Sequence, residues 1–233
     1  MSVCYAPGMT PWNKGFKKET HVSVRKVSDT MKARRVDNFK KWRDAHLVQY
    51  EEFAHNGDLA ELIGAVLGDG NIEKFPRTER LVVVGDAQKP EFVWRYANLI
   101  EKLFKKKPVV KKALRSNALR ISIYQKFISE RLGVPTGNKK HFPHQIPQWI
   151  EENDAYIVRF LRGLYEAEGS LSIHLPTCTY NFCFTNLNPY LLKIVDDALT
   201  HLEFHTEVRH NAIRIRKRAE VMRLKELIRF RQY

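Results

Sequence analysis

Apolar residues along the chain switch between helical spacing and strand-like alternation, and the same succession of patterns occurs twice. Each copy has an apolar helix ending in acid-glycine, two strand-like runs, an amphipathic helix opened by proline, two more strand-like runs and a last helix. The predicted elements of the first copy lie at 58–68, 71–74, 80–85, 90–104, 109–117, 118–125 and 126–132. Those of the second copy lie at 154–167, 170–175, 180–185, 189–202, 206–211, 212–218 and 220–230.

The two copies align at a spacing of 99 residues, where LIGAVLGDGN at 62–71 matches LRGLYEAEGS at 161–170. Gly64 falls on Gly163, and Asp69 falls on Glu168. Because only two copies exist, the repeat predicts a pseudo-dimer and not a solenoid. The predicted fold class is α+β, with tandem αββαββα repeats, antiparallel sheets and polar alternate positions along the strands. The predicted domains are a basic arm at 1–56, a first repeat with its linker at 57–150, and a second repeat at 151–233.

Charge is distributed unevenly over these parts. The formal net charge of +14 comes as +7 from residues 1–50, +6 from residues 51–150 and +1 from residues 151–233. Such an excess indicates a polyanionic partner, either nucleic acid or an anionic membrane, with a merely basic solvated surface as the alternative. An apolar content of 43% excludes a disordered chain. No apolar run approaches the roughly 18 residues of a membrane span.

The three cysteines and the first residues indicate the compartment. The cysteines have neither the spacing of a zinc site nor the number needed for a disulfide framework. The first residues, MSVCYAPGMTPW, contain no apolar core of a signal peptide. We therefore expect an intracellular protein, cytoplasmic or organellar and not secreted, with no membrane partner.

Glycines in the two apolar helices suggest where the chemistry lies. Gly64, Gly68 and Gly163 occupy helix positions that glycine normally disfavours, and such small residues let two helix backbones approach closely. If the helices pack together, Asp69 and Glu168 converge at their ends. Two carboxylates held together repel unless a cation lies between them, which predicts a hard divalent ion such as Mg²⁺. The alternative is that each acid is only a turn residue at a helix end, although the helix dipole disfavours acids there.

The segments LIGAVLGDG and FLRGLYEAEGSLS resemble the two signature motifs of single-chain LAGLIDADG homing endonucleases, and the resemblance covers about residues 57–233. It implies that the signature helices form the interface between the repeats. It further implies two saddle-shaped sheets in the DNA major groove and divalent ions beneath the helices. The implied metal ligands are the carboxylates of Asp69 and Glu168 and the backbone carbonyls of Gly68 and Ala167.

Other active-site positions follow from the same resemblance. Gln88 resembles the polar residue that positions the attacking water, and its counterpart is either Asn186 or Asn188. The stretch GNKKHFPHQIPQW resembles the segment between family repeats, which makes Lys139 the implied active-site lysine and Lys140 the alternative. A solvated linker charge is the competing interpretation. The second copy ends at FRQY without a matching lysine, so we expect one DNA strand to be cut more slowly.

Basic and polar residues on the strands are the candidates for contacts to bases and phosphates. These candidates are Lys74, Arg77, Arg80, Lys111, Arg115 and Arg120 in the first copy, and His174, Thr177, Tyr180, Arg209, Arg214 and Arg216 in the second. In the arm, PWNKGFKKE and VRKVSDTMKARR resemble short modular DNA-binding elements appended to homing nucleases, and a basic helix-like stretch follows at 37–55. The alternative for the arm is a solubilising tail.

Taken together, these features predict a monomeric, site-specific, Mg²⁺-dependent homing endonuclease that makes a double-strand break in a long DNA target, as in intron homing. Two alternatives stay open. One is a maturase that binds its host intron RNA, and the other is a DNA-binding regulator that keeps the fold without catalysis.

Overall fold

The computed structural model describes residues 10–34, 50–113 and 116–233, which fall into two compact units, Met1–Glu51 and Glu52–Tyr233. In the first unit, α1 (Val22–Ala33) follows two turns, and the ring of Phe16 stacks on His21 with 4.4 Å between centroids. The helix-like stretch expected at 37–55 lies outside the described residues up to 49. Residues 50–55 are not helical, so that part of the prediction is wrong.

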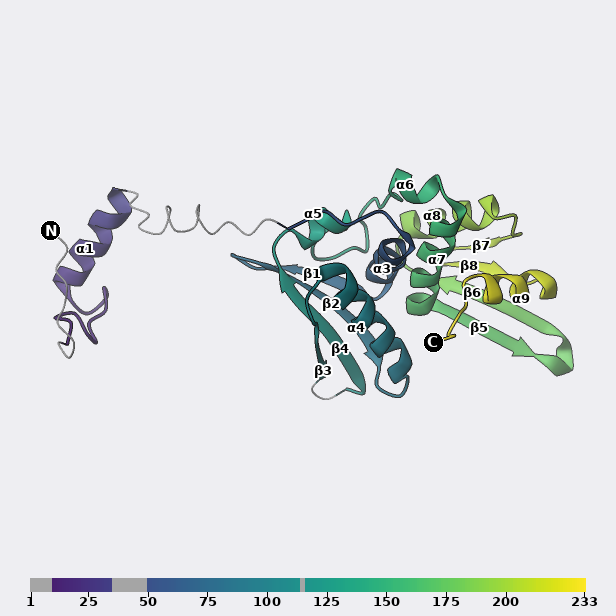
Figure 1. The fold of residues 1–233 in the computed structure, drawn as a ribbon, viewed down its shortest axis with the longest axis horizontal. Coiled ribbons are helices and arrows are strands. Elements are labelled where there is room, and N and C mark those ends of the chain that lie inside the picture. The colour runs from purple at the N-terminus through teal and green to yellow at the C-terminus, as the bar shows by residue number, and fades with distance from the viewer. Residues whose placement is uncertain (1–9, 35–49, 114–115) are drawn as a thin grey trace. The chain divides into compact units, whose positions relative to one another are not determined.

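The second unit contains both repeats, and each forms its own four-stranded antiparallel sheet (Figure 1). The elements of the first repeat are α3 (Gly57–Gly68), β1 (Gly70–Lys74), β2 (Glu79–Asp86), α4 (Pro90–Phe104), β3 (Val109–Lys112), β4 (Ala118–Gln125) and α5 (Ile128–Leu132). After the short α6 (Gln148–Glu151), the second repeat comprises α7 (Asp154–Glu168), β5 (Gly169–His174), β6 (Thr179–Thr185), α8 (Pro189–His201), β7 (Glu207–Arg209), β8 (Ala212–Ile215) and α9 (Arg218–Leu227).

The strand orders are β1-β2-β4-β3 and β5-β6-β8-β7, so the two repeats have the same topology and the predicted α+β fold is confirmed. Three predicted strands are too long. β3 ends at Lys112, β7 covers only Glu207–Arg209 before a turn at 210–211, and β8 ends at Ile215 instead of residue 218. Beyond β3 and β7 the sequence runs into consecutive polar residues at 116–117 and 210–211, which lie in bends and turns, so the alternation had already ended there.

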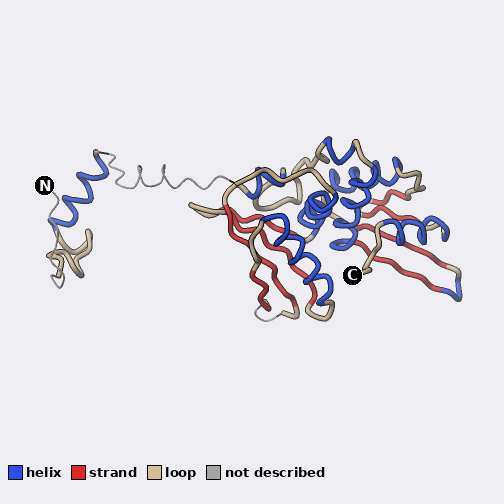
Figure 2. The backbone as a smooth tube through the Cα atoms, viewed as in Figure 1, coloured by secondary structure: helices blue, strands red, loops and turns tan. Residues whose placement is uncertain are grey.

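Helices α3 and α7 pack against each other, with one sheet on either side of the pair (Figures 1 and 2). A Cβ atom at Gly64 would lie 2.2 Å from the carbonyl oxygen of Phe160, and one at Gly163 would lie 2.1 Å from that of Glu61. No side chain fits at these distances, so glycine is what lets the two backbones touch. The close helix approach predicted from the glycine positions is therefore confirmed.

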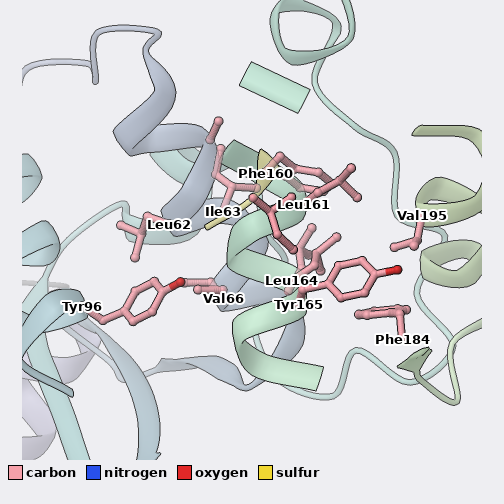
Figure 3. Close-up of a cluster of buried hydrophobic side chains, with 14 of the residues drawn as sticks. Leu62, Ile63, Val66, Tyr96, Phe160, Leu161, Leu164, Tyr165, Phe184 and Val195 are labelled. Atoms are coloured by element: carbon pink, nitrogen blue, oxygen red, sulfur yellow. The ribbon is translucent and has the colours of Figure 1, made fainter. Parts of the chain in front are cut away.

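A single hydrophobic core crosses this interface (Figure 3). Leu62 of α3 and Leu164 of α7 are fully buried at its centre. Tyr96 of α4 extends the core into the first repeat, and Phe184 of β6 extends it into the second. Because the two repeats share one core, the ends of α3 and α7 are held in fixed relative positions. None of the described helices combines the length and apolar character needed to cross a membrane.

Candidate functional site

The two signature helices end beside each other, and each end carries a carboxylate. Asp69 is the C-terminal cap of α3, and Glu168 is the last residue of α7. A Cβ atom at Gly68 would lie 2.6 Å from Cβ of Ala167 and 3.4 Å from Cγ of Glu168, so the helix ends are in contact. The packing of α3 on α7 thus brings together the four residues that the sequence nominated as metal ligands.

Both carboxyl groups have pKa values above their ordinary range. Desolvation at the helix ends raises the pKa of Asp69, although part of the residue is exposed, and the attraction of the Lys139 ammonium opposes this change. Burial also raises the pKa of Glu168, the charge of Asp69 raises it further, and Lys139 again opposes the change. Each ionised carboxylate is therefore disfavoured by its surroundings, and a nearby cation would relieve that cost.

Lys139 reaches this point from the linker between the repeats. Its Nζ donates to the carbonyl oxygens of Leu67 at 3.0 Å, Gly68 at 3.3 Å and Gly70 at 2.6 Å, and also to that of Val66. Burial lowers the pKa of Lys139 to about 8, while Asp69 and Glu168 act to raise it. Lys140, the alternative, is exposed. Of the two candidates, only Lys139 has its amine at the end of α3.

Two cavities flank the helix ends, and each combines a carboxylate from one helix with a backbone segment of the other. The first, of about 450 Å³, is lined by Glu168 together with Gly68, Lys139, His144 and Asn186. We call it the Glu168 cavity. His144 is buried, and burial together with the charge of Lys139 lowers its pKa. A hydrogen bond with the backbone of Lys139 opposes that shift.

The second cavity, of about 380 Å³, is lined by Asp69, Ala167, Lys89 and Arg231, among others, and we call it the Asp69 cavity. It has the same plan as the first, with the carboxylate and the preceding backbone exchanged between the two helices. Its basic residues differ, however, because Lys139 lines only the Glu168 cavity. The pseudo-symmetry of the backbone therefore does not extend to the charged side chains.

The three amide candidates have different positions. Asn186 donates from Nδ2 to Oε1 of Glu168 at 3.3 Å, so it contacts the carboxylate directly. Asn188 instead caps α8, since its Oδ1 accepts from the backbone nitrogens of the next turn. Gln88 is exposed and lines neither cavity. Asn186 and Asn188 both line the Glu168 cavity, but of the three amides only Asn186 is hydrogen-bonded to the carboxylate of Glu168.

Three residues of the Asp69 cavity, Glu166, Arg231 and Tyr233, escaped the sequence-based prediction. Glu166 accepts from the backbone nitrogen of Arg231 at 2.7 Å and from the hydroxyl of Tyr233. Burial raises the pKa of Glu166, and these hydrogen bonds oppose the change. As a result, Arg231 and Tyr233 form one wall of the Asp69 cavity. The signal in the sequence was Glu166 itself, an acidic residue aligned with the apolar Leu67 of the first copy.

An ion-pair network joins the N-terminal halves of α3 and α7, at the other end of the helices from Asp69 and Glu168. The carboxylate of Glu61, which is fully buried, accepts from Arg95 Nε at 2.7 Å and from Arg159 Nε at 2.7 Å. Arg159 Nη2 also donates to Oδ1 of Asp58 at 2.6 Å. Here α3 supplies the two acidic residues and α7 supplies a basic residue. These charges favour packing of α3 against α7 over packing of α3 against a second α3, or of α7 against a second α7.

Most of the nominated residues of the first sheet are exposed, but they do not share one face. Lys111 and Arg120 are cross-strand neighbours on the face away from α4. Arg80 lies on that face too, where it bonds to Glu73 and to the hydroxyl of Tyr124. Two positions differ: Lys74 pairs opposite Glu79 on the other face, and Arg77 lies in the turn between β1 and β2. Arg115 lies outside the described residues.

In the second sheet, one nominated residue is wrongly assigned. Tyr180 is only 8% exposed and belongs to the core, because it shares the inner face of β6 with Phe182 and Phe184. His174 and Thr177 are exposed and bonded to each other at 2.7 Å. The nominated arginines, Arg209, Arg214 and Arg216, lie on or just after β7 and β8, and Arg209 and Arg216 pair with Glu207.

The described residues contain no group of three or more His, Cys, Asp or Glu side chains that could hold a metal ion. What the helix ends offer is two carboxylates with the backbone carbonyls of Gly68 and Ala167. These are all oxygen donors, which fit a hard divalent cation and leave coordination positions for water or a phosphate.

Comparison with known proteins agrees with this architecture. Residues 155–233 match the family described as LAGLIDADG-like domain. The structure of I-DmoI in complex with DNA and Mn aligns with a TM-score of 0.52 and 17% identity, covering 74% of this chain and 96% of that one. The N-terminal LAGLIDADG domain of WhiA aligns with a TM-score of 0.50 and 18% identity, covering 76% and 83%. At these identities the likeness concerns the fold.

A shorter sequence match involves a protein that is not described as a LAGLIDADG protein. The tRNA-splicing ligase RtcB of Methanopyrus kandleri is 42% identical over 45 residues, which are 19% of this chain and 5% of that protein. Because the match spans so little of the relative, it carries no inference about activity.

Proposed function

We propose that this chain, which has the LAGLIDADG fold and whose residues 155–233 match the LAGLIDADG-like family, is a site-specific, double-strand DNA endonuclease of the homing type. The observation that carries the proposal is the meeting of Asp69 and Glu168 at the ends of two helices whose backbones touch. A fold needed only for binding has no requirement for two carboxylates with raised pKa values beside each other at this point.

Each cavity is proposed to serve one DNA strand. Asp69 with the carbonyl of Ala167 would hold a divalent ion at one cavity, and Glu168 with the carbonyl of Gly68 at the other. A bound ion of this kind lowers the pKa of water and stabilises charge on the phosphate. Within the chain, the Lys139 ammonium would attract the scissile phosphate of the Glu168 cavity. Asn186 would hold the orientation of the Glu168 carboxylate.

The proposed partner is double-stranded DNA. The outer faces of the sheets carry exposed cations such as Lys111 and Arg120, and residues 1–150 hold almost all of the excess positive charge. I-DmoI, named a homing endonuclease, has been described in complex with DNA and Mn, and a variant of it in the presence of Mg. The proposal includes Mg²⁺ as the working ion and a monomer acting inside the cell, with the basic arm adding contacts to DNA.

The fold by itself does not assign catalysis, because WhiA also contains a LAGLIDADG domain of this shape. A DNA-binding regulator is therefore the second candidate. It predicts DNA binding that is indifferent to the two carboxylates, whereas a nuclease requires them for cleavage. A maturase remains an untested prediction.

Selection from a random library tests the proposal without knowledge of the target. A duplex library with a long randomised region would be incubated with the full chain and Mg²⁺, and the newly formed ends would be captured and sequenced. A nuclease yields recurrent breaks at one sequence, abolished by EDTA. Enrichment of bound sequences without new ends in Mg²⁺ or Mn²⁺ would refute the nuclease and support the regulator.

A further inference from the structure

The linker between the repeats contacts both of them through Lys139, which bonds to the first repeat with its side-chain ammonium and to the second with its backbone carbonyl. The ammonium of Lys139 bonds to the carbonyl oxygens that end α3 in the first repeat. Its backbone carbonyl accepts from Nδ2 of Asn188, in the second repeat, at 2.7 Å. The position of the ammonium beside Glu168 therefore depends on a contact made by the backbone of the same residue.

Asn188 uses its whole hydrogen-bonding capacity in this arrangement. Only 3% of the residue is exposed. Its Nδ2 donates to the carbonyls of Lys139 at 2.7 Å and Phe142 at 2.9 Å. Its Oδ1 accepts from the backbone nitrogens of Tyr190 at 2.9 Å and Leu191 at 3.4 Å. Two donated and two accepted bonds are all that a side-chain amide can satisfy well in a buried position.

Helix capping explains only half of these contacts. Asp, Ser or Thr would accept the hydrogen bonds that begin α8 about as well as Asn. None of them offers two N–H donors, so the bonds to the linker require an amide. At the matching position of the first repeat, Lys89 makes no side-chain cap for α4. The amide is thus a feature of the second repeat alone, on the side of the Glu168 cavity.

We propose that Asn188 is the positioning residue of the Glu168 cavity, because its amide fixes the linker so that the Lys139 ammonium stays at the end of α3. The inference rests on the proposed nuclease function for its meaning in catalysis. The Asp69 cavity does not include Asn188, and its wall is formed by Arg231 and Tyr233. Because the Lys139 ammonium lines the Glu168 cavity but also attracts the Asp69 carboxylate, loss of the amide should impair cleavage at the Glu168 cavity more than at the Asp69 cavity.

The variant Asn188→Asp tests this with little disturbance of the fold. The carboxylate keeps the acceptor that caps α8, and a negative charge at that helix end is favourable. It places an oxygen, in place of an N–H donor, against the carbonyls of Lys139 and Phe142. Asn153→Asp is the matched control, because Asn153 caps α7 in the same way, through Oδ1 to Ala155 N at 2.9 Å.

The readout is single-turnover cleavage of the selected duplex with each strand labelled separately. Glu168→Gln first identifies the strand that depends on the Glu168 cavity. Asn188→Asp should slow that strand about 10- to 100-fold, as expected for a misplaced active-site group, and slow the other strand several-fold less. Nicked DNA should accumulate, with unchanged DNA affinity. A variant that cuts each strand at the wild-type rate, or that slows both strands by the same factor, would overturn the assignment.

A second measurement does not require cleavage. Acylation of Lys139 by an amine-reactive ester, followed by peptide mass spectrometry, reports how firmly the amine is held. Labelling should be severalfold faster in Asn188→Asp than in wild type or Asn153→Asp. If wild type cuts no DNA, the proposed function fails, whereas unchanged labelling of Lys139 in the variant refutes the positioning role by itself.

Discussion

Replacing Gly163 by alanine tests the contact between α3 and α7 on which the position of both carboxylates depends. The added Cβ atom would lie 2.1 Å from the carbonyl oxygen of Glu61 and 2.6 Å from the backbone nitrogen of Ala65. Non-bonded heavy atoms pack best at about 3.5–4.0 Å, so the helix backbones must separate by more than about 1 Å. Both obstructing atoms are backbone, and neither can rotate away.

The expected magnitude follows from two opposing effects. Overpacking a dense core costs about 1–3 kcal/mol, and the rigid obstruction here favours the upper end of that range. Alanine gains about 1 kcal/mol over glycine in a helix interior. We therefore expect Gly163→Ala to lower the free energy of unfolding by about 2 kcal/mol.

Urea unfolding followed by far-UV circular dichroism measures this change. Gly57→Ala, in the first turn of α3, is the matched control, since its Cβ would meet Cγ of Arg159 at 3.0 Å, an atom of a side chain that can move. It should be close to neutral or stabilising. If Gly163→Ala proves as stable as Gly57→Ala, the helix contact is looser than the structure indicates and the account of the interface is refuted.

Three further predictions concern charge. Glu61→Gln should lower the free energy of unfolding by about 3 kcal/mol, because Arg159 and its neighbours lose a buried carboxylate; an unchanged urea midpoint would contradict this. Burial alone would raise the pKa of Asp58, but hydrogen bonds from Lys102 and Arg159 outweigh it and lower that pKa. The stability contributed by Asp58 is therefore present above the ordinary carboxyl pKa and lost as pH falls through the folded value. The advantage of wild type over Asp58→Asn should be full near about pH 6, begin to fall near about pH 4 and disappear only below the lowered folded pKa, as thermal unfolding across pH would show. Deleting residues 1–50 should make DNA affinity less dependent on salt, by about 0.9 in the logarithmic slope for each phosphate that the arm neutralises, and an unchanged slope would exclude the arm from binding.

The fold could be predicted because its determinants are local and occur twice. Gly64 and Gly163 are unusual in apolar helices, and their common cause is a backbone contact that the structure confirms. The carboxylates at the helix ends followed from the same alignment. The glycines and the carboxylates each lie within one short helical segment, so a single sequence shows both of them directly.

The parts that could not be predicted depend on partners distant in sequence. Tyr180 falls on the inner face of its strand because the register of β6 sets which residues face the core. Glu166 is satisfied by residues 65 and 67 positions away, Arg231 and Tyr233. The role of Asn188 depends on the linker reaching back to α8. The periodicity of apolar and polar residues carries no information on these contacts between residues far apart in the sequence.

The central claim is that Asp69 and Glu168 act together in hydrolysis of DNA. The most direct measurement compares wild type with the double variant Asp69→Asn, Glu168→Gln on the selected duplex in Mg²⁺, with binding measured in parallel. Each replacement preserves the size of the side chain and removes only its charge. The account predicts full binding by the double variant with cleavage of neither strand. Cleavage at the wild-type rate by the double variant would contradict it.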